Sequence, residues 1–528
     1  QGSIYNEEKK MKQYQIYELT FKGKEPEGDF VNVDIKGTFQ VNGNNICVKG
    51  FYDGEGNYRV RYLPLESGWC EYKVESSLEL YGTMEGREWV EVADQKDHGL
   101  VRVNNLSFQY EDGTPYLPYG TTVYALLHQE KILMDETMET LKTAPFNKVR
   151  MCIFPKYFEF NRNEPEIFPF ERDAEENWDV KRPDVTFWNK LDETLIQLQE
   201  YGIQADLILL HPYDCWGLMY LTREEYKIYL EYLVRRVAAY PNVWWSLANE
   251  YDLMDGLEQK DWEAFAEYLG MNDPYQHLLS NHNFVHPWDF SNPYTTHCSL
   301  QQADAAKIPA LFRYRKPVIY DELGYEGNIP FNWGNLSGFE IVNRFWKTCC
   351  MGAYATHGET YMEKMDDNQI LWWSKGGRLK GESVLRIAYM RELFEEMPGT
   401  LTLYHSPDAV PFETQQQLRE MVAGGKSEIA DNLVFKCMCK LNDAEFAHMM
   451  EFMTPPIVHY KDEVFLTYLG DACTIYTTMN LPEDAVYTVE IIDVWEMTRT
   501  VIKTNASGKT EIDLPGKVGI AVLATKES

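Results

Sequence analysis

The sequence lacks any run of about 18 or more apolar residues, and residues 1–10 show no apolar core of a secretion signal. The first absence excludes a membrane-spanning helix. The second leads us to expect a cytoplasmic protein, with secretion left open if a leader has been removed. Basic residues are also few: 50 lysines and arginines stand against 82 aspartates and glutamates, a formal net charge of −32. Such a chain repels nucleic acid and anionic membrane, so neither is an expected partner.

The ten cysteines form no C-x2-C pair and no dense framework. A disulfide scaffold and a cysteine zinc site are therefore not indicated, and free thiols in a reducing compartment are expected. No sequence feature calls for a cofactor or a metal ion, and we expect none. The oligomeric state is not predicted.

The 528 residues leave room for about three domains of ~150 residues. Short alternating runs with turn signals fill residues 12–100 and return after residue 400, which is typical of β-sandwiches. We predict an N-terminal immunoglobulin-like β-sandwich over 1–103, a central domain over 104–398 and a C-terminal β-sandwich over 399–528. Strands of the last domain are expected at 432–437, 464–468, 487–492 and 518–523.

The central region alternates short apolar runs with helical patterns, which indicates βα units and a TIM (β/α)8 barrel. A small hairpin over 100–118 is expected to close the barrel floor. The barrel strands are expected at 116–122, 148–153, 205–210, 243–248, 277–283, 294–301, 318–322 and 352–361.

Two of these strands end in acid. Asn249 and Glu250 follow the fourth, and Asp321 and Glu322 close the seventh. Catalytic groups of such barrels lie at the carboxyl ends of the strands, and two carboxyls are what glycoside hydrolysis requires. We prefer Glu322 to Asp321, because adjacent residues of an extended strand point to opposite faces. Glu326 is expected in the following loop.

Asn-Glu closing one strand and a glutamate in Asp-Glu-Leu-Gly closing a later one resemble clan A glycoside hydrolases, the family-5-like (β/α)8 enzymes. The resemblance covers residues 115 to 395. It implies a retaining β-glycoside hydrolase acting on plant-type oligo- or polysaccharides, with Glu250 as acid/base and Glu322 as nucleophile. It also implies that Arg150, on the second strand, supports the nucleophile and that Asn249 holds a sugar hydroxyl.

Further sugar contacts are expected from residues near the other strand ends. His211 matches the third-strand histidine of the clan, and a tryptophan after strand eight commonly floors the −1 sugar site. The candidates are His211, His282, His297, His357, Glu359, Trp372 and Trp373.

Two other functions remain open. Several histidines in a hydrolytic barrel can bind zinc, but a metal-dependent amidohydrolase usually shows His-x-His on strand one, and residues 119–124 have none. A non-catalytic carbohydrate-binding barrel is the other alternative. The presence of Glu250, Glu322, Asn249 and Arg150 together argues against it.

Overall fold

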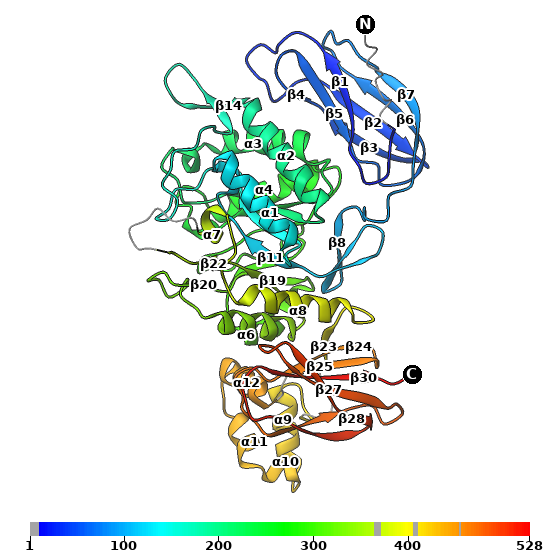
Figure 1. The fold of residues 1–528 in the computed structure, drawn as a ribbon, viewed down its shortest axis with the longest axis vertical. Coiled ribbons are helices and arrows are strands. Elements are labelled where there is room, and N and C mark those ends of the chain that lie inside the picture. The colour runs from blue at the N-terminus through cyan, green and yellow to red at the C-terminus, as the bar shows by residue number, and fades with distance from the viewer. Residues whose placement is uncertain (1–9, 364–370, 405–409, 454–455) are drawn as a thin grey trace. The chain divides into compact units, whose positions relative to one another are not determined.

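The computed structural model describes residues 10–363, 371–404, 410–453 and 456–528. The chain divides into two compact units (Figure 1). Unit 1 comprises residues 1–301, 314–336 and 356–381, and unit 2 comprises residues 302–313, 337–355 and 382–528.

A parallel sheet forms the central barrel that the sequence predicts. In the described part of the chain it has eight strands in the order β17-β16-β15-β12-β11-β21-β19-β18, so the first and last strands along the chain, β11 and β21, are neighbours. The strands are β11 (Tyr119–Thr122), β12 (Lys148–Cys152), β15 (Gln204–Leu210), β16 (Val243–Ala248), β17 (Leu279–Ser280), β18 (Cys298–Gln301), β19 (Val318–Glu322) and β21 (Tyr354–His357). The fifth and sixth strands are shorter than expected, since β17 has two residues and β18 has four.

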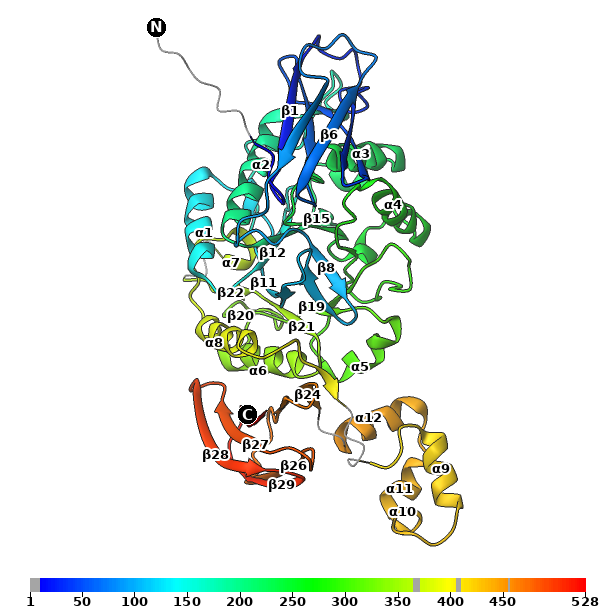
Figure 2. The ribbon, with the colours of Figure 1, turned by 90° about the vertical axis from the view of Figure 1, so that its right-hand side faces the viewer.

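The helices of the βα units follow the expected pattern. In unit 1, α1 (Lys131–Thr143), α2 (Val185–Glu200), α3 (Arg223–Val237), α4 (Gln259–Asn272) and α7 (Trp372–Lys375) are found, and α1 to α4 surround the strands (Figure 2). Helix α3 begins where Thr222 and Glu225 form a capping box. Unit 2 contributes α5 (Ile308–Leu311), α6 (Gly338–Cys349) and α8 (Ser383–Glu395).

The N-terminal region consists of antiparallel sheets, as expected. One has the order β1-β5-β4 and the other β3-β2-β6-β7. Strand β6 alternates buried and exposed side chains, which is typical of a strand with one face on a core. The strands are β1 (Tyr17–Lys22), β2 (Lys36–Val41), β3 (Asn44–Lys49), β4 (Phe51–Tyr52), β5 (Asn57–Tyr62), β6 (Gly68–Glu75) and β7 (Glu85–Val90).

The predicted floor hairpin is also present, as β8 (Val101–Asn104), β9 (Ser107–Tyr110) and β10 (Pro115–Tyr116). Its Phe108 ring lies 5.5 Å from the ring of Trp244, near the start of β16. Short pairs are formed by β13 (Phe170–Arg172) with β14 (Trp178–Pro183) and by β20 (Glu326–Gly327) with β22 (Glu359–Thr360).

The C-terminal region contains the expected β-sheets, a six-stranded sheet and the pair β26-β29, in the described residues. Their strands are β23 (Thr402–Tyr404), β24 (Ile457–Tyr460), β25 (Val464–Tyr468), β26 (Tyr476–Asn480), β27 (Tyr487–Asp493), β28 (Thr498–Ala506), β29 (Lys509–Asp513) and β30 (Ile520–Lys526). The exact domain boundaries stay predictions.

One predicted strand of this region is wrong. Residues 432–437 lie in a helical segment made of α9 (Gln415–Ala423), α10 (Glu428–Asp431), α11 (Leu433–Met438) and α12 (Asp443–Met453). The side chain of Asn432 accepts hydrogen bonds from the backbone of Val434 and Phe435 and so starts α11. Met438 then packs with Leu418 and Phe446. A short apolar run fits a strand or a buried helix equally well, and here the helix cap decides.

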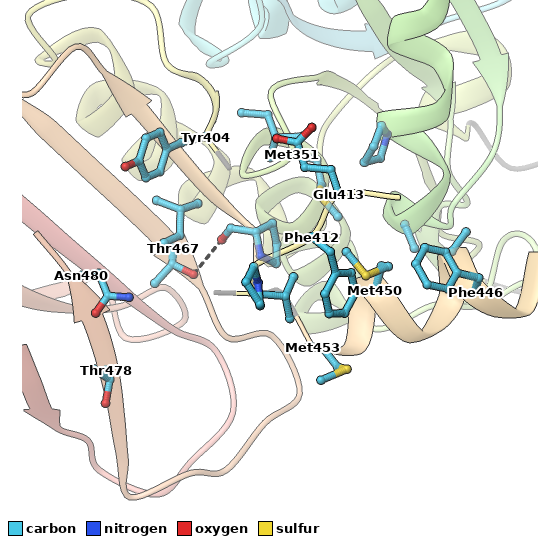
Figure 3. A pocket seen from close by; sticks show the side chains of 18 of the residues that line it. Met351, Tyr404, Phe412, Glu413, Phe446, Met450, Met453, Thr467, Thr478 and Asn480 are labelled. Carbon is cyan, nitrogen blue, oxygen red and sulfur yellow. Dashed lines mark hydrogen bonds between the residues drawn. The ribbon is translucent and has the colours of Figure 1, made fainter. Parts of the chain in front are cut away.

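Unit 2 has an open pocket of about 1480 Å³ between this helical segment and the sheets. Phe446 and Met450 of α12 line one side, and Thr467 of β25 and Asn480 of β26 line the other (Figure 3). No helix in the described ranges has the length and apolar character needed to cross a bilayer.

The interior of the barrel carries a buried charged layer. Lys148 Nζ lies 2.9 Å from Asp206 Oδ2 and 2.7 Å from Asp321 Oδ1, and none of the three side chains is more than 4% exposed. Thr356 donates a further hydrogen bond to Asp321 at 2.8 Å. Burial alone would raise the pKa of Asp321, but the Lys148 charge brings it well below its ordinary range.

We predict that Lys148→Met lowers the stability of the barrel by about 3–5 kcal/mol, because it leaves two buried carboxyls without their shared cation. Thermal unfolding followed by circular dichroism measures the effect. Lys131→Met is the matched control, since Lys131 is 84% exposed in a surface pair with Asp135. Equal melting temperatures for the two variants would contradict the prediction.

Candidate active site

Glu250 stands directly after Asn249 at the carboxyl end of β16, where a short 3₁₀ turn (Tyr251–Leu253) begins. Its backbone adopts φ = 56°, in the left-handed region that a residue with a side chain rarely occupies. Its N–H points to Nδ1 of His282 at 3.4 Å. Strained backbone of this kind concentrates at functional sites.

The Glu250 carboxyl is buried and hydrogen-bonded on both oxygens. Tyr213 OH donates to Oε2. The Gln301 amide, in the orientation that satisfies both of its polar atoms, donates to Oε1 at 2.9 Å. Burial and the nearby Glu322 charge raise the pKa of Glu250 to about 7. The carboxyl therefore carries a proton over much of the range below neutrality and can act as an acid.

Glu322 has a different environment at the end of β19. Tyr124 OH donates to its Oε1, and Arg150 Nη1 lies 3.6 Å from the same atom. Arg150 therefore places a positive charge beside this carboxyl. Two neighbouring carboxyls with unlike surroundings are the arrangement that separates an acid from a nucleophile.

Arg150 and Asn249 connect these groups. Arg150 Nη2 donates to Asn249 Oδ1 at 3.0 Å, and the Tyr124 hydroxyl oxygen lies 3.1 Å from the same atom. The Asn249 oxygen is thus occupied, while its amide nitrogen has no acceptor among the described residues. This nitrogen is available to hold a sugar hydroxyl.

Asp321 and Glu326, the two other acidic residues near the end of β19, have partners away from Glu250. Strand alternation predicts that Asp321 points to the outer face of the barrel. In the structure its side chain instead lies inside the barrel, against Lys148. The pairing of β18 with β19 shifts register between Leu300 and Gln301, and such an irregularity breaks the simple alternation. Glu326 lies in the short strand β20 rather than in a loop, is fully buried, and accepts a hydrogen bond from Tyr361 OH at 2.8 Å.

Of the four predicted histidines, the structure places His282 beside Glu250 and His211 beside Tyr213, the residue that donates to Glu250. His282 Nδ1 accepts a hydrogen bond from the Glu250 backbone N–H, and the buried Nε2 of His282 has no partner among the described residues. His211 Nε2 donates a hydrogen bond to the Phe154 carbonyl at 3.1 Å, and its Nδ1 accepts one from the Tyr213 backbone N–H at 3.2 Å. His211 therefore positions Tyr213, and of these two histidines only His282 keeps a nitrogen without a partner among the described residues.

The other two histidines do not face the glutamates. His297 precedes β18, at its amino end, and its ring contacts the floor residues Phe108 and Trp244. His357 hydrogen-bonds Thr121 at 2.9 Å and stacks on Phe146 at 4.6 Å. Neither position suits the predicted contact with a sugar.

The two candidate tryptophans also differ. The Trp373 ring lies 5.6 Å from Tyr124 and 5.1 Å from Trp333, within an aromatic cluster beside Glu322. The Trp372 indole donates to the Thr121 hydroxyl at 2.8 Å, and the same hydroxyl also hydrogen-bonds His357. Of the two tryptophans, Trp373 thus lies beside Glu322, and Trp372 lies with Thr121 and His357.

Glu359, which is predicted to contact the sugar, instead forms hydrogen bonds to the backbone of the loop that contains Lys380 and Gly381. Its oxygens accept from the backbone N–H groups of Lys380 and Gly381, at 2.5 and 2.7 Å. Burial raises its pKa to about 7. Its side chain meets Glu326 across the β20–β22 pair, where a Cβ on Gly381 would collide with both carboxyls.

Sequence reasoning missed four residues that surround the glutamates: Tyr124, Lys156, Tyr213 and Gln301. Each lies at or shortly after the end of a barrel strand, so the rule that placed the glutamates could have drawn attention to them. Their side chains, however, belong to residue types that are common in loops.

An eight-stranded parallel barrel with two glutamates at the ends of its fourth and seventh strands defines a clan A glycoside hydrolase, an enzyme that acts on glycosidic bonds. More particularly, the chain belongs to the apiosidase-like family, whose catalytic-domain model matches residues 103–400. Two models of domains of unknown function match residues 10–77 and 454–525. No protein of curated function matches the sequence significantly.

Solved structures agree with this assignment. A protein of Bacteroides vulgatus ATCC 8482, assigned as a glycoside hydrolase, is 31% identical over 98% of this chain and 100% of its own, with a TM-score of 0.82. A family 5 glycoside hydrolase of the same organism is 13% identical over 81% of this chain and 93% of its own, with a TM-score of 0.57. The second likeness concerns the fold alone.

We predict that kcat/KM falls as the pH rises through about 7, because Glu250 must be protonated to act as the acid. Tyr213→Phe removes a hydrogen bond that favours the Glu250 carboxylate, so this pKa rises and the alkaline limb moves to higher pH. A pH profile of kcat/KM measures the shift. Tyr220→Phe is the control, since Tyr220 is 71% exposed. An alkaline limb that stays in place in Tyr213→Phe would refute this role.

Proposed function

We propose that the protein is a retaining β-glycoside hydrolase that cleaves plant-type oligo- or polysaccharides by double displacement. The family's description as apiosidase-like favours apiose as the sugar that is released. The observation that supports this mechanism most is that the two glutamates at the strand ends have unlike surroundings. Glu250 is buried and has a pKa of about 7, whereas Glu322 lies beside Arg150.

In the first step, the Glu322 carboxylate attacks the anomeric carbon while Glu250 gives its proton to the leaving oxygen. Arg150 and Tyr124 stabilise the Glu322 charge before attack. Trp373 offers a ring face to the sugar, and Asn249 and His282 offer unpaired N–H groups to its hydroxyls.

In the second step, Glu250 removes a proton from water, the resulting hydroxide attacks the anomeric carbon, and Glu322 leaves as a carboxylate. The glycosyl ester has neutralised Glu322, and that charge is a cause of the raised pKa of Glu250. Esterification therefore lowers this pKa and converts the acid into a base.

We predict that Glu250→Gln and Glu322→Gln each reduce turnover by a factor of about 10² or more while the melting temperature stays close to that of the wild type. Azide should restore activity on an activated aryl β-glycoside to Glu322→Gly, giving the α-glycosyl azide, and to Glu250→Ala, giving the β-glycosyl azide. A near-wild-type rate in either glutamine variant on a natural substrate would show that the assignment is wrong.

The stereochemical course tests the mechanism directly. We expect NMR to show the β-anomer as the first product from a β-glycoside, because two displacements restore the configuration. Aryl β-apioside and a panel of other aryl β-glycosides serve as substrates. An α-anomer formed first would mean inversion and would remove Glu322 from the role of nucleophile.

A further inference from the structure

Lys156 is a buried lysine without a fixed partner, on the loop that follows β12. It is 4% exposed. In the described part of the chain, its ammonium has neither a hydrogen-bond acceptor nor an acidic group within salt-bridge distance. A buried lysine is rare unless it is paired, so this position calls for an explanation.

Aromatic rings surround the ammonium in place of an anion. Lys156 Nζ lies 3.7 Å from the ring centre of Tyr124, 4.6 Å from those of Tyr213 and Trp373, and 5.5 Å from that of Phe158. Ring faces attract a cation electrostatically, and more strongly where water is excluded.

Two of these rings belong to the tyrosines that hold the catalytic carboxyls. Tyr124 donates to Glu322, and Tyr213 donates to Glu250. The loop is tied to the same elements, since Tyr157 N–H donates to the Tyr213 carbonyl at 2.8 Å and the Asn161 amide holds the Lys156 carbonyl. The ammonium therefore keeps a defined place between the two carboxyl–tyrosine pairs.

We propose that Lys156 is a positioning residue of the hydrolytic reaction, whose ammonium supports the catalytic negative charge on either glutamate through the two tyrosine rings and its own field. This inference rests on the double displacement proposed above. In that reaction the pair carries one negative charge throughout: it starts on Glu322, moves to Glu250 in the glycosyl-enzyme, and returns to Glu322 when water attacks.

The two cations of the site, Arg150 and Lys156, differ in which of the two glutamates they contact directly or through a tyrosine. Arg150 lies 3.6 Å from Glu322 and forms no ion pair with Glu250 among the described residues. Lys156 touches the hydrogen-bonding tyrosine of each glutamate. The charged and titratable groups that face Lys156 include Cys152, Glu250, Glu322, Arg150 and His211. Burial lowers the pKa of Lys156, and both glutamates oppose that shift.

Removing the ammonium should raise the pKa of Glu250, because the Lys156 charge is among the causes that lower it. Glu250 then becomes a weaker acid for glycosylation but a stronger base for deglycosylation. Glu322, without the same support, becomes a better nucleophile but a poorer leaving group. These effects oppose one another within each step, so the alkaline limb of the pH profile should move by about one unit while the maximal rate changes by less than about tenfold.

The test is Lys156→Met, assayed on an activated aryl β-glycoside that the wild type hydrolyses. We expect the alkaline limb of the kcat/KM–pH profile to move to higher pH by about one unit, while the maximal kcat/KM stays within about tenfold of the wild-type value. Lys156→Arg should keep the wild-type limbs, because it keeps the charge.

Lys316→Met is the matched control. Its ammonium is half-buried and bonds the carbonyls of Phe290 and Asn292, so its loss should leave both pH limbs in place. A higher KM at unchanged kcat with the alkaline limb in place would make Lys156 a simple sugar contact, and a lower melting temperature without a pH shift would make it structural. Either result overturns the proposal. Inversion by the wild type would instead overturn the proposed function itself.

Discussion

Arg150 has no surface exposed to water, and the mouth of the barrel depends on how its charge is compensated. A buried ion costs several kcal/mol unless hydrogen bonds and opposite charge surround it. The guanidinium meets that requirement with Tyr124 OH, Asn249 Oδ1 and the Asp321 carbonyl, and with the nearby Glu322 carboxylate. Residues from three strand ends are thereby held around one planar group, which has a defined direction for each bond.

The layer beneath gives the two adjacent acids of β19 different surroundings. Lys148 engages Asp321 and Asp206, so Asp321 is committed to the interior of the barrel. Glu322, one residue later, lies above this layer in contact with Tyr124 and Arg150. A carboxylate bound to a lysine is a poor nucleophile, since its charge is already compensated. The interior layer thus leaves one carboxylate of the seventh strand available for attack.

The fold and the glutamates could be predicted because both depend on local pattern: an apolar run, its end, and the residue type that follows. The histidines show where that reasoning stops. Whether His297 or His357 faces the mouth depends on the residue at which β18 begins and on the face that β21 presents, and sequence patterns place strand ends only to within a few residues. Lys156 lies in an irregular loop, whose course no periodicity reveals.

The cage around Lys156 has a physical advantage over an ion pair. A carboxylate beside the ammonium would stabilise it but would also cancel most of its field at Glu250 and Glu322. Ring faces stabilise a cation through their quadrupoles without adding net charge, so the field of the ammonium persists beyond the cage. In a site where one negative charge passes between two groups, a cation stabilised by rings can serve both groups. A cation bound to either carboxylate would favour that one and oppose the transfer.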